Sequence, residues 1–69
     1  MKRFILRVMG SVDIHKLRDI LEPEEGVVID HAIETAIAID LPESWDAESV
    51  RKLTRVHSIE YQGYKETAL

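Results

Sequence analysis

The side chains that could do chemistry are few in this sequence, and they lie far apart. The three histidines, His15, His31 and His57, fall in different predicted elements, and the chain has no cysteine. A zinc site needs closely paired ligands of these types, so we expect neither a metal nor a cofactor. The serines lack a nucleophile-elbow motif; they are Ser11, Ser44, Ser49 and Ser58. The sequence therefore predicts a binding protein rather than an enzyme.

The net charge of the chain excludes some classes of binding partner. The 69 residues carry a formal net charge of −4 at pH 7, with an isoelectric point near 5.2. Nucleic acids and anionic membranes select basic surfaces, so we expect neither as a partner. The chain starts with a basic and then apolar stretch, but Arg7 interrupts it, and we expect a strand there rather than a signal peptide. The composition therefore argues against both of these classes of partner.

Periodicity predicts six elements that would position these residues. Branched and aromatic residues at 4–9 predict a strand, and apolar residues at helical spacing predict a helix that ends near residue 21. Residues 27–41 read as two strands with a turn at Glu34-Thr35. Ser44 or Asp46 can cap a second helix that reaches about Arg55, and residues 59–61 form a short last strand.

The order strand, helix, strand, strand, helix, strand predicts an α+β fold. Right-handed crossovers place both helices on one face of a four-stranded antiparallel sheet. This is a ferredoxin-like βαββαβ sandwich, spanning residues 1–63. Residues 64–69 show no periodicity and are expected to form an extended C-terminal tail.

Alternation along the strands assigns residues to the two faces of the sheet. The helices should cover the more apolar sets, such as Phe4 and Leu6 or Ile37 and Ile39. The other face is left open. It should carry Ile5, Met9, Val28, Ala32, Ala36 and Ala38, bordered by Arg3, Arg7, Asp30 and Asp40. An apolar patch with a charged rim is typical of an interaction surface, although scattered apolar residues also occur on solvated sheet faces.

Four segments together suggest a family. They are residues 3–8, the stretch 33–42 with its alternating Ala and Ile residues before Pro42, residues 48–53 and residues 57–61. In these segments the chain resembles the subtilisin propeptides, the inhibitor domains that precede subtilisin-type serine proteases. It departs from their pattern in three places. No aromatic precedes Ala36, His57 stands where proline is usual, and Gln62-Gly63-Tyr64 replaces an acidic pair.

The resemblance implies an inhibitor and intramolecular chaperone of a subtilisin-type serine protease, monomeric when free. Its open face would dock on two protease helices, and a propeptide would be secreted with its protease. The docking residues implied are Ala32, Ala36 and Ala38, with Asp30, Asp40 and Glu60 facing helix N-termini. The tail would lie in the substrate cleft as an added strand that ends like a reaction product. Its residues are Tyr64, Lys65, Glu66, Thr67, Ala68 and Leu69.

A second hypothesis comes from another class of protein. The same fold serves in small-molecule-sensing or assembly domains, such as ACT-like regulatory modules, which dimerise through a sheet edge or a helix face. Such a module has no use for a six-residue tail that ends in Leu69, so the tail is the feature that separates the two hypotheses.

Overall fold

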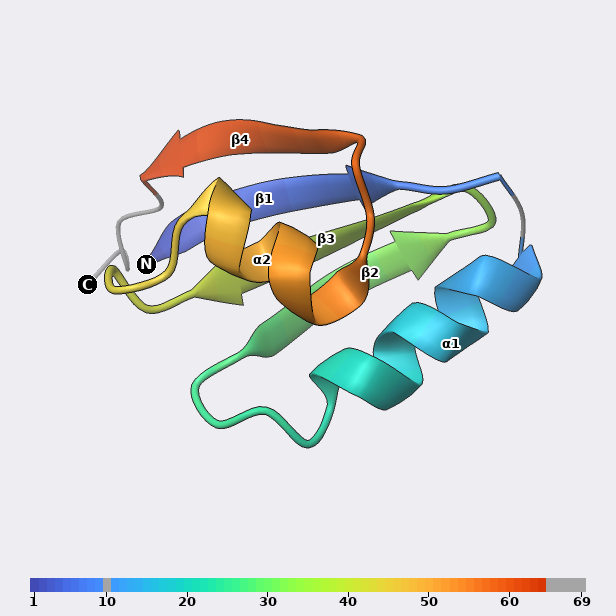
Figure 1. Ribbon diagram of the computed structural model, residues 1–69, viewed down its shortest axis with the longest axis horizontal. Coiled ribbons are helices and arrows are strands. Elements are labelled where there is room, and N and C mark those ends of the chain that lie inside the picture. Colours follow the sequence, from blue (N-terminus) through green and yellow to red (C-terminus); the bar gives the residue numbers. More distant parts are fainter. Residues whose placement is uncertain (10, 65–69) are drawn as a thin grey trace.

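The computed structural model describes residues 1–9 and 11–64, without the side chains of residues 11, 12 and 64. Six elements follow the predicted order (Figure 1). They are β1 (Lys2–Arg7), α1 (Ser11–Leu21), β2 (Val28–Ile33), β3 (Ala36–Leu41), α2 (Ala47–Thr54) and β4 (Ile59–Tyr64). The turn between β2 and β3 falls at Glu34 and Thr35, as the sequence predicts.

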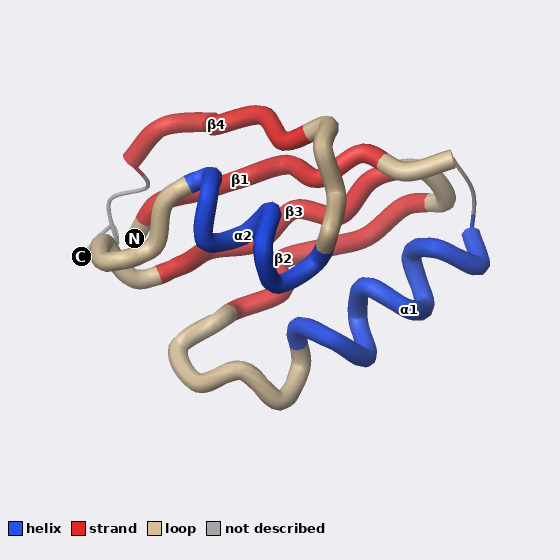
Figure 2. Tube along the Cα trace, viewed as in Figure 1, coloured by secondary structure: helices blue, strands red, loops and turns tan. Residues whose placement is uncertain are grey.

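The strands form one antiparallel sheet in the order β2-β3-β1-β4, and the prediction of an α+β, ferredoxin-like fold is confirmed. Both helices lie on the same side of the sheet and leave its other face open (Figure 2). The central pair, β1 and β3, aligns Arg3 with Asp40, Ile5 with Ala38 and Arg7 with Ala36. These pairs are the middle of the open face.

The core lies between the sheet and the helices. Its buried side chains are Phe4, Leu6, Ile14, Leu17, Leu21, Ile37, Ile39, Leu41 and Val50. Burying an aliphatic side chain of this size stabilises a fold by about 1.5–3 kcal/mol. This set confirms which face of β1 and β3 meets the helices. Ile20 differs from the expectation, because it lies at the edge of the helix stripe and stays 36% exposed.

Local signals fix the ends of α2. Asp46 is the N-cap, and its carboxylate accepts a hydrogen bond of 2.8 Å from the backbone N–H of Ser49. Arg55 is the C-cap and adopts the left-handed conformation, with a φ of 61°. A left-handed residue commonly ends a helix, but glycine usually occupies that position.

Gly26 closes the loop between α1 and β2 and has a φ of +83°. A Cβ atom at this position would lie 2.9 Å from Cγ of Pro42. Both the backbone conformation and this close approach therefore require glycine, as its place in the sequence suggests.

The last strand is longer than predicted. It continues through Gln62 and Gly63 to Tyr64, which pairs with Lys2 at the start of β1. A β-bulge allows this, because Gln62 is the extra residue and Gly63 takes a φ of +97°. Tyr64 thus belongs to β4, although the sequence placed it in the tail. The other predicted tail residues, 65–69, lie outside the described residues.

Candidate functional site

The open sheet face is the side of the sheet that the helices leave uncovered. Strand register assigns its residues, because residues paired across neighbouring strands point to the same side. They are Arg3, Ile5 and Arg7 from β1, Val28, His31 and Ile33 from β2, Ala36, Ala38 and Asp40 from β3, and Glu60 and Gln62 from β4.

The middle of the open sheet face is a shallow hollow of about 260 Å³. Its floor is β3, where Ala36 is half-buried and Ala38 is 3% exposed. Ile5 and Ile33 give it apolar sides. Small floor residues between larger neighbours let another surface approach the backbone of the sheet closely.

An ion-pair network lies beside the hollow on the same face of the sheet. The guanidinium of Arg3 donates two hydrogen bonds to the Asp40 carboxylate, from Nε at 2.8 Å and from Nη2 at 3.0 Å. Asp30 lies on the other side of the same guanidinium, with 3.3 Å between its Oδ1 and Nη2. Hydrogen bonding to Asp40 raises the pKa of Arg3 above its usual range. Asp40 is only 6% exposed, so this pairing stabilises a carboxylate that is nearly buried.

A β-bulge at Asp30 shapes the second part of the network. The register of β2 against β3 shifts between Ile29 and His31, so Asp30 has no partner residue in the ladder. Its carboxylate contacts Nδ1 of His31 at 2.7 Å as well as Arg3. The bulge thus turns both side chains of this dipeptide toward the open sheet face.

The other side of the hollow carries an exposed charged pair. Nη2 of Arg7 lies 3.2 Å from Oε2 of Glu60, the neighbour of Ile5 on β4. Gln62 also donates a hydrogen bond to Glu60. Both members of the pair are about half exposed, so water and a partner can reach them.

The structure corrects one predicted docking residue and brings the others together. Ala32 was expected on the open sheet face, but it pairs with Ile37 and packs against the core. The bulge at Asp30 is the reason, because one extra residue moves every later side chain of β2 to the opposite side. Ala36, Ala38, Asp30, Asp40 and Glu60 do share one face, as predicted.

His31 and Ile33 are residues of this face that sequence reasoning missed, and they take the side that Ala32 was given. The run from Val28 to Ile33 offers no glycine or proline that would signal a bulge. Met9 is also displaced, since it follows the end of β1 and lines a different hollow, between the two helices. Of the predicted cleft-binding residues, the backbone of Tyr64 lies in β4.

The described residues contain no cluster of three or more His, Asp or Glu side chains placed to hold a metal ion. Within the same part of the chain, neither helix has the length and apolar character needed to cross a membrane. No significant match to this chain was found among models of protein families, curated proteins or solved structures.

Proposed function

We propose that this chain binds a subtilisin-type serine protease through the open sheet face and acts as its propeptide-like inhibitor and intramolecular chaperone. One observation carries the proposal. The helix-free side of the sheet has a floor of small residues, Ala36 and Ala38, in its central strand β3. The sequence resemblance supplies the class of partner, and the role needs no metal or cofactor.

The shape of the face supports docking of a rigid element such as a helix. The alanine floor lies between the larger side chains of Ile5 and Ile33, which line the same hollow. A partner that fills the hollow would remove apolar surface from water at its centre and leave the charged residues at the edge. A largely dry centre with a polar rim is the usual anatomy of a protein interface.

The ion pairs refine the roles that the resemblance implies for the carboxylates. Asp40 is nearly buried and held by Arg3, so its role is to fix the surface rather than to contact a partner. Glu60 is about half exposed, and so is its partner Arg7. Glu60 is therefore the carboxylate best placed to meet the positive N-terminus of a protease helix.

Inhibition assays test the proposal directly. The purified chain should be titrated against a panel of subtilisin-type proteases, with a trypsin-like serine protease as a control. We expect saturable inhibition of at least one subtilisin-type enzyme and none of the trypsin-like enzyme. Failure to inhibit any member of the panel, or equal inhibition of the control, would contradict the proposed partner.

A further inference from the structure

A second hollow lies on the helix side of the molecule, where α1 faces the C-terminal end of α2. Its volume is about 340 Å³, within the roughly 300–1,000 Å³ that is usual for small-molecule sites. One stripe of α1 lines it with Asp13, Lys16, Leu17 and Ile20, the positions that recur on one face of a helix. This hollow differs from the one on the open sheet face, and the two share only Arg7 among their described lining residues.

The hollow gathers positive charge in an acidic chain. Arg7, Lys16 and Arg55 line it, together with His57. Arg7 is paired with Glu60, whereas Lys16 and Arg55 make no side-chain hydrogen bond or ion pair with another described residue. Asp13 is the one acidic side chain among the described residues that line it. Lys16 and Arg55 therefore supply a local positive field that no carboxylate of the described chain neutralises by contact.

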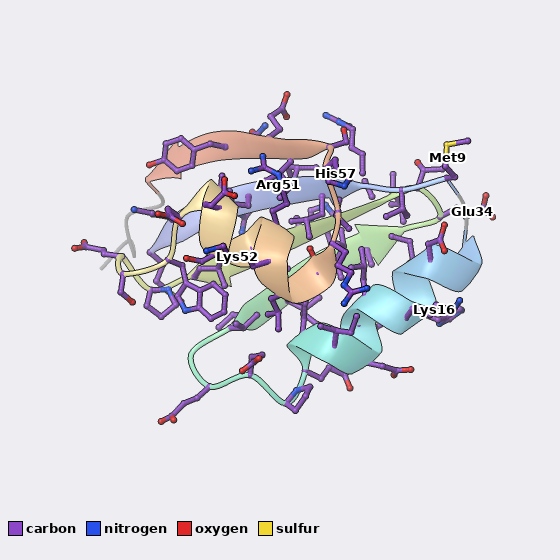
Figure 3. All side chains as sticks on the ribbon, viewed as in Figure 1. Met9, Lys16, Glu34, Arg51, Lys52 and His57 are labelled. Carbon is purple, nitrogen blue, oxygen red and sulfur yellow. The ribbon has the colours of Figure 1, made fainter. Side chains whose placement is uncertain are left out.

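The side chains beside these cations are apolar and partly exposed to water. Met9 is 95% exposed and Ile20 is 36% exposed, and both line the hollow together with the half-buried Val8 and Val56. Met9 and Lys16 lie toward the same end of the molecule (Figure 3). A ligand with an apolar part would remove water from this wall, while its charged group met the cations.

The backbone at Arg55 is a second and independent observation. Its φ of 61° is a conformation in which a non-glycine residue is disfavoured, yet three hydrogen bonds hold the turn in place. Arg55 N–H donates to the carbonyl of Arg51, Val56 N–H donates to Oγ1 of Thr54, and that hydroxyl donates to the carbonyl of Val50. Strain that the surrounding structure holds in this way is typical of functional positions. Here its effect is to present an arginine at the hollow where glycine would suit the helix end better.

We propose that the hollow between α1 and α2 binds a small organic anion with a short apolar chain. The anionic group would lie between Lys16 and Arg55, and the chain would lie along Met9 and Ile20. The site is on the opposite side of the sheet from the proposed docking surface. It therefore stands or falls separately from the protease proposal.

Octanoate is a suitable probe, because it combines one carboxylate with a short alkyl chain. Titration of the full chain at low ionic strength, followed by amide chemical shifts in NMR spectra, should saturate and should move the signals of residues 13–20 and 54–57. Two further probes separate the contributions. Octan-1-ol offers the chain alone and inorganic phosphate offers the charge alone, and each should bind more weakly than octanoate. Equal binding of octanol would overturn the proposal, because the cations would then contribute nothing.

Three variants locate the site. Lys16→Gln and Arg55→Gly should each weaken octanoate binding by roughly twofold to fivefold, the range for one exposed or partly exposed charge contact. Arg55→Gly should fold at least as well as the parent chain, because glycine favours the left-handed helix end. Lys52→Gln is the matched control, since Lys52 is an exposed lysine of α2 that lines a separate surface beside Trp45 (Figure 3).

Two further results would overturn the assignment. The first is equal weakening by Lys52→Gln and Lys16→Gln, which would indicate a response to overall charge. The second is tight binding to anionic lipid vesicles without binding of monomeric octanoate, which would indicate a membrane surface as the ligand. Saturable octanoate binding that is lost in the two hollow variants alone supports the proposal.

Discussion

Arg3 and Asp40 are paired across the two central strands of the sheet, and the guanidinium of Arg3 donates one hydrogen bond to each carboxylate oxygen of Asp40, at 2.8 and 3.0 Å. Planar guanidinium and carboxylate groups fit each other in this two-point arrangement, which fixes orientation as well as distance. Asp40 has little contact with water, so Arg3 replaces the solvation that the carboxylate has lost. The Arg3–Asp40 pair therefore both stabilises the fold and fixes the arrangement of side chains at this end of the open sheet face.

Replacing Arg3 with Gln should lower the urea midpoint of unfolding clearly, because the nearly buried carboxylate of Asp40 loses the two charge-assisted hydrogen bonds from the guanidinium. Arg51→Gln is the matched control, since Arg51 forms an exposed ion pair with Glu48 within one helix. Exposed pairs of this kind contribute little to stability. Equal effects of the two substitutions would show that the Arg3–Asp40 pair is no more important than a surface ion pair.

Thr54 offers a test of the turn that ends α2. Its hydroxyl is buried, donates to the carbonyl of Val50 and accepts from the N–H of Val56. Thr54→Val keeps the shape but leaves that N–H without its acceptor, so it should reduce the free energy of unfolding by about 1–3 kcal/mol. Thr35→Val, at an exposed turn, should change it by no more than about 0.5 kcal/mol. Chemical denaturation of both variants measures the difference, and similar small effects would contradict the assigned role.

The N-cap Asp46 should make the stability of the fold depend on acid. Hydrogen bonds from Ser49, first from its backbone N–H and then from its hydroxyl, hold the pKa of Asp46 below its ordinary value. A lowered folded-state pKa means that the charged cap stabilises the fold fully above about pH 4, the unfolded value, and that this is lost as the pH falls through the folded value. The urea midpoints of the parent and Asp46→Ala should therefore differ most at neutral pH and approach each other as the pH falls below about 4.

Asp46→Asn is the control for this prediction. Asparagine also caps helices but does not titrate, so it should retain more stability than Asp46→Ala at neutral pH. It should also lack the acid-dependent loss that is specific to this carboxylate. A difference between parent and Asp46→Ala that stays constant from neutral pH to pH 2 would show that charge does not contribute to the cap.

Alternation was enough to predict the faces of β1 and β3, because neither strand is interrupted between Lys2 and Arg7 or between Ala36 and Leu41. It failed on the two edge strands, because the bulges at Asp30 and Gln62 each add one residue and so reverse the side that the later side chains face. A bulge depends on how a strand fits its neighbour, and a sequence read one strand at a time does not contain that information. For this reason Ala32 was placed on the wrong face and β4 was predicted too short.

The sequence predicted most of the residues that line the candidate site, but not the contacts between them. Alternation placed Arg3, Asp30 and Asp40 together at the rim of the open face. It did not reveal that Arg3 grips Asp40, because that contact depends on which residues pair across β1 and β3. The left-handed turn at Arg55 was missed too, since only glycine or asparagine normally signals one.

Ala36 provides the sharpest test of docking by the open sheet face. It is half-buried in the floor of the hollow, and an arginine there would project into the space that a partner must enter. If the protease proposal is right, Ala36→Arg should raise the inhibition constant at least about tenfold, which corresponds to about 1.4 kcal/mol. Ser44→Arg adds the same bulk and charge in an exposed turn and should leave inhibition unchanged. Circular dichroism should be the same for both variants, and unchanged inhibition by Ala36→Arg would exclude this face from the interface.

The segment after β4 tests whether inhibition is product-like. Residues 65–69 lie outside the described residues, and the protease proposal assigns their extended backbone to the substrate cleft. The resemblance gives Leu69 to the large apolar pocket before the cut, with the small Ala68 and Thr67 in the positions preceding it. The core that the described residues form runs from Phe4 to Val50, so the chain without these three residues should still fold. The inhibition constant should nevertheless rise at least about tenfold. The product-like mechanism is wrong if the shortened chain inhibits as well as the full chain. If Ala36→Arg also loses inhibition in that case, inhibition arises from the sheet face alone.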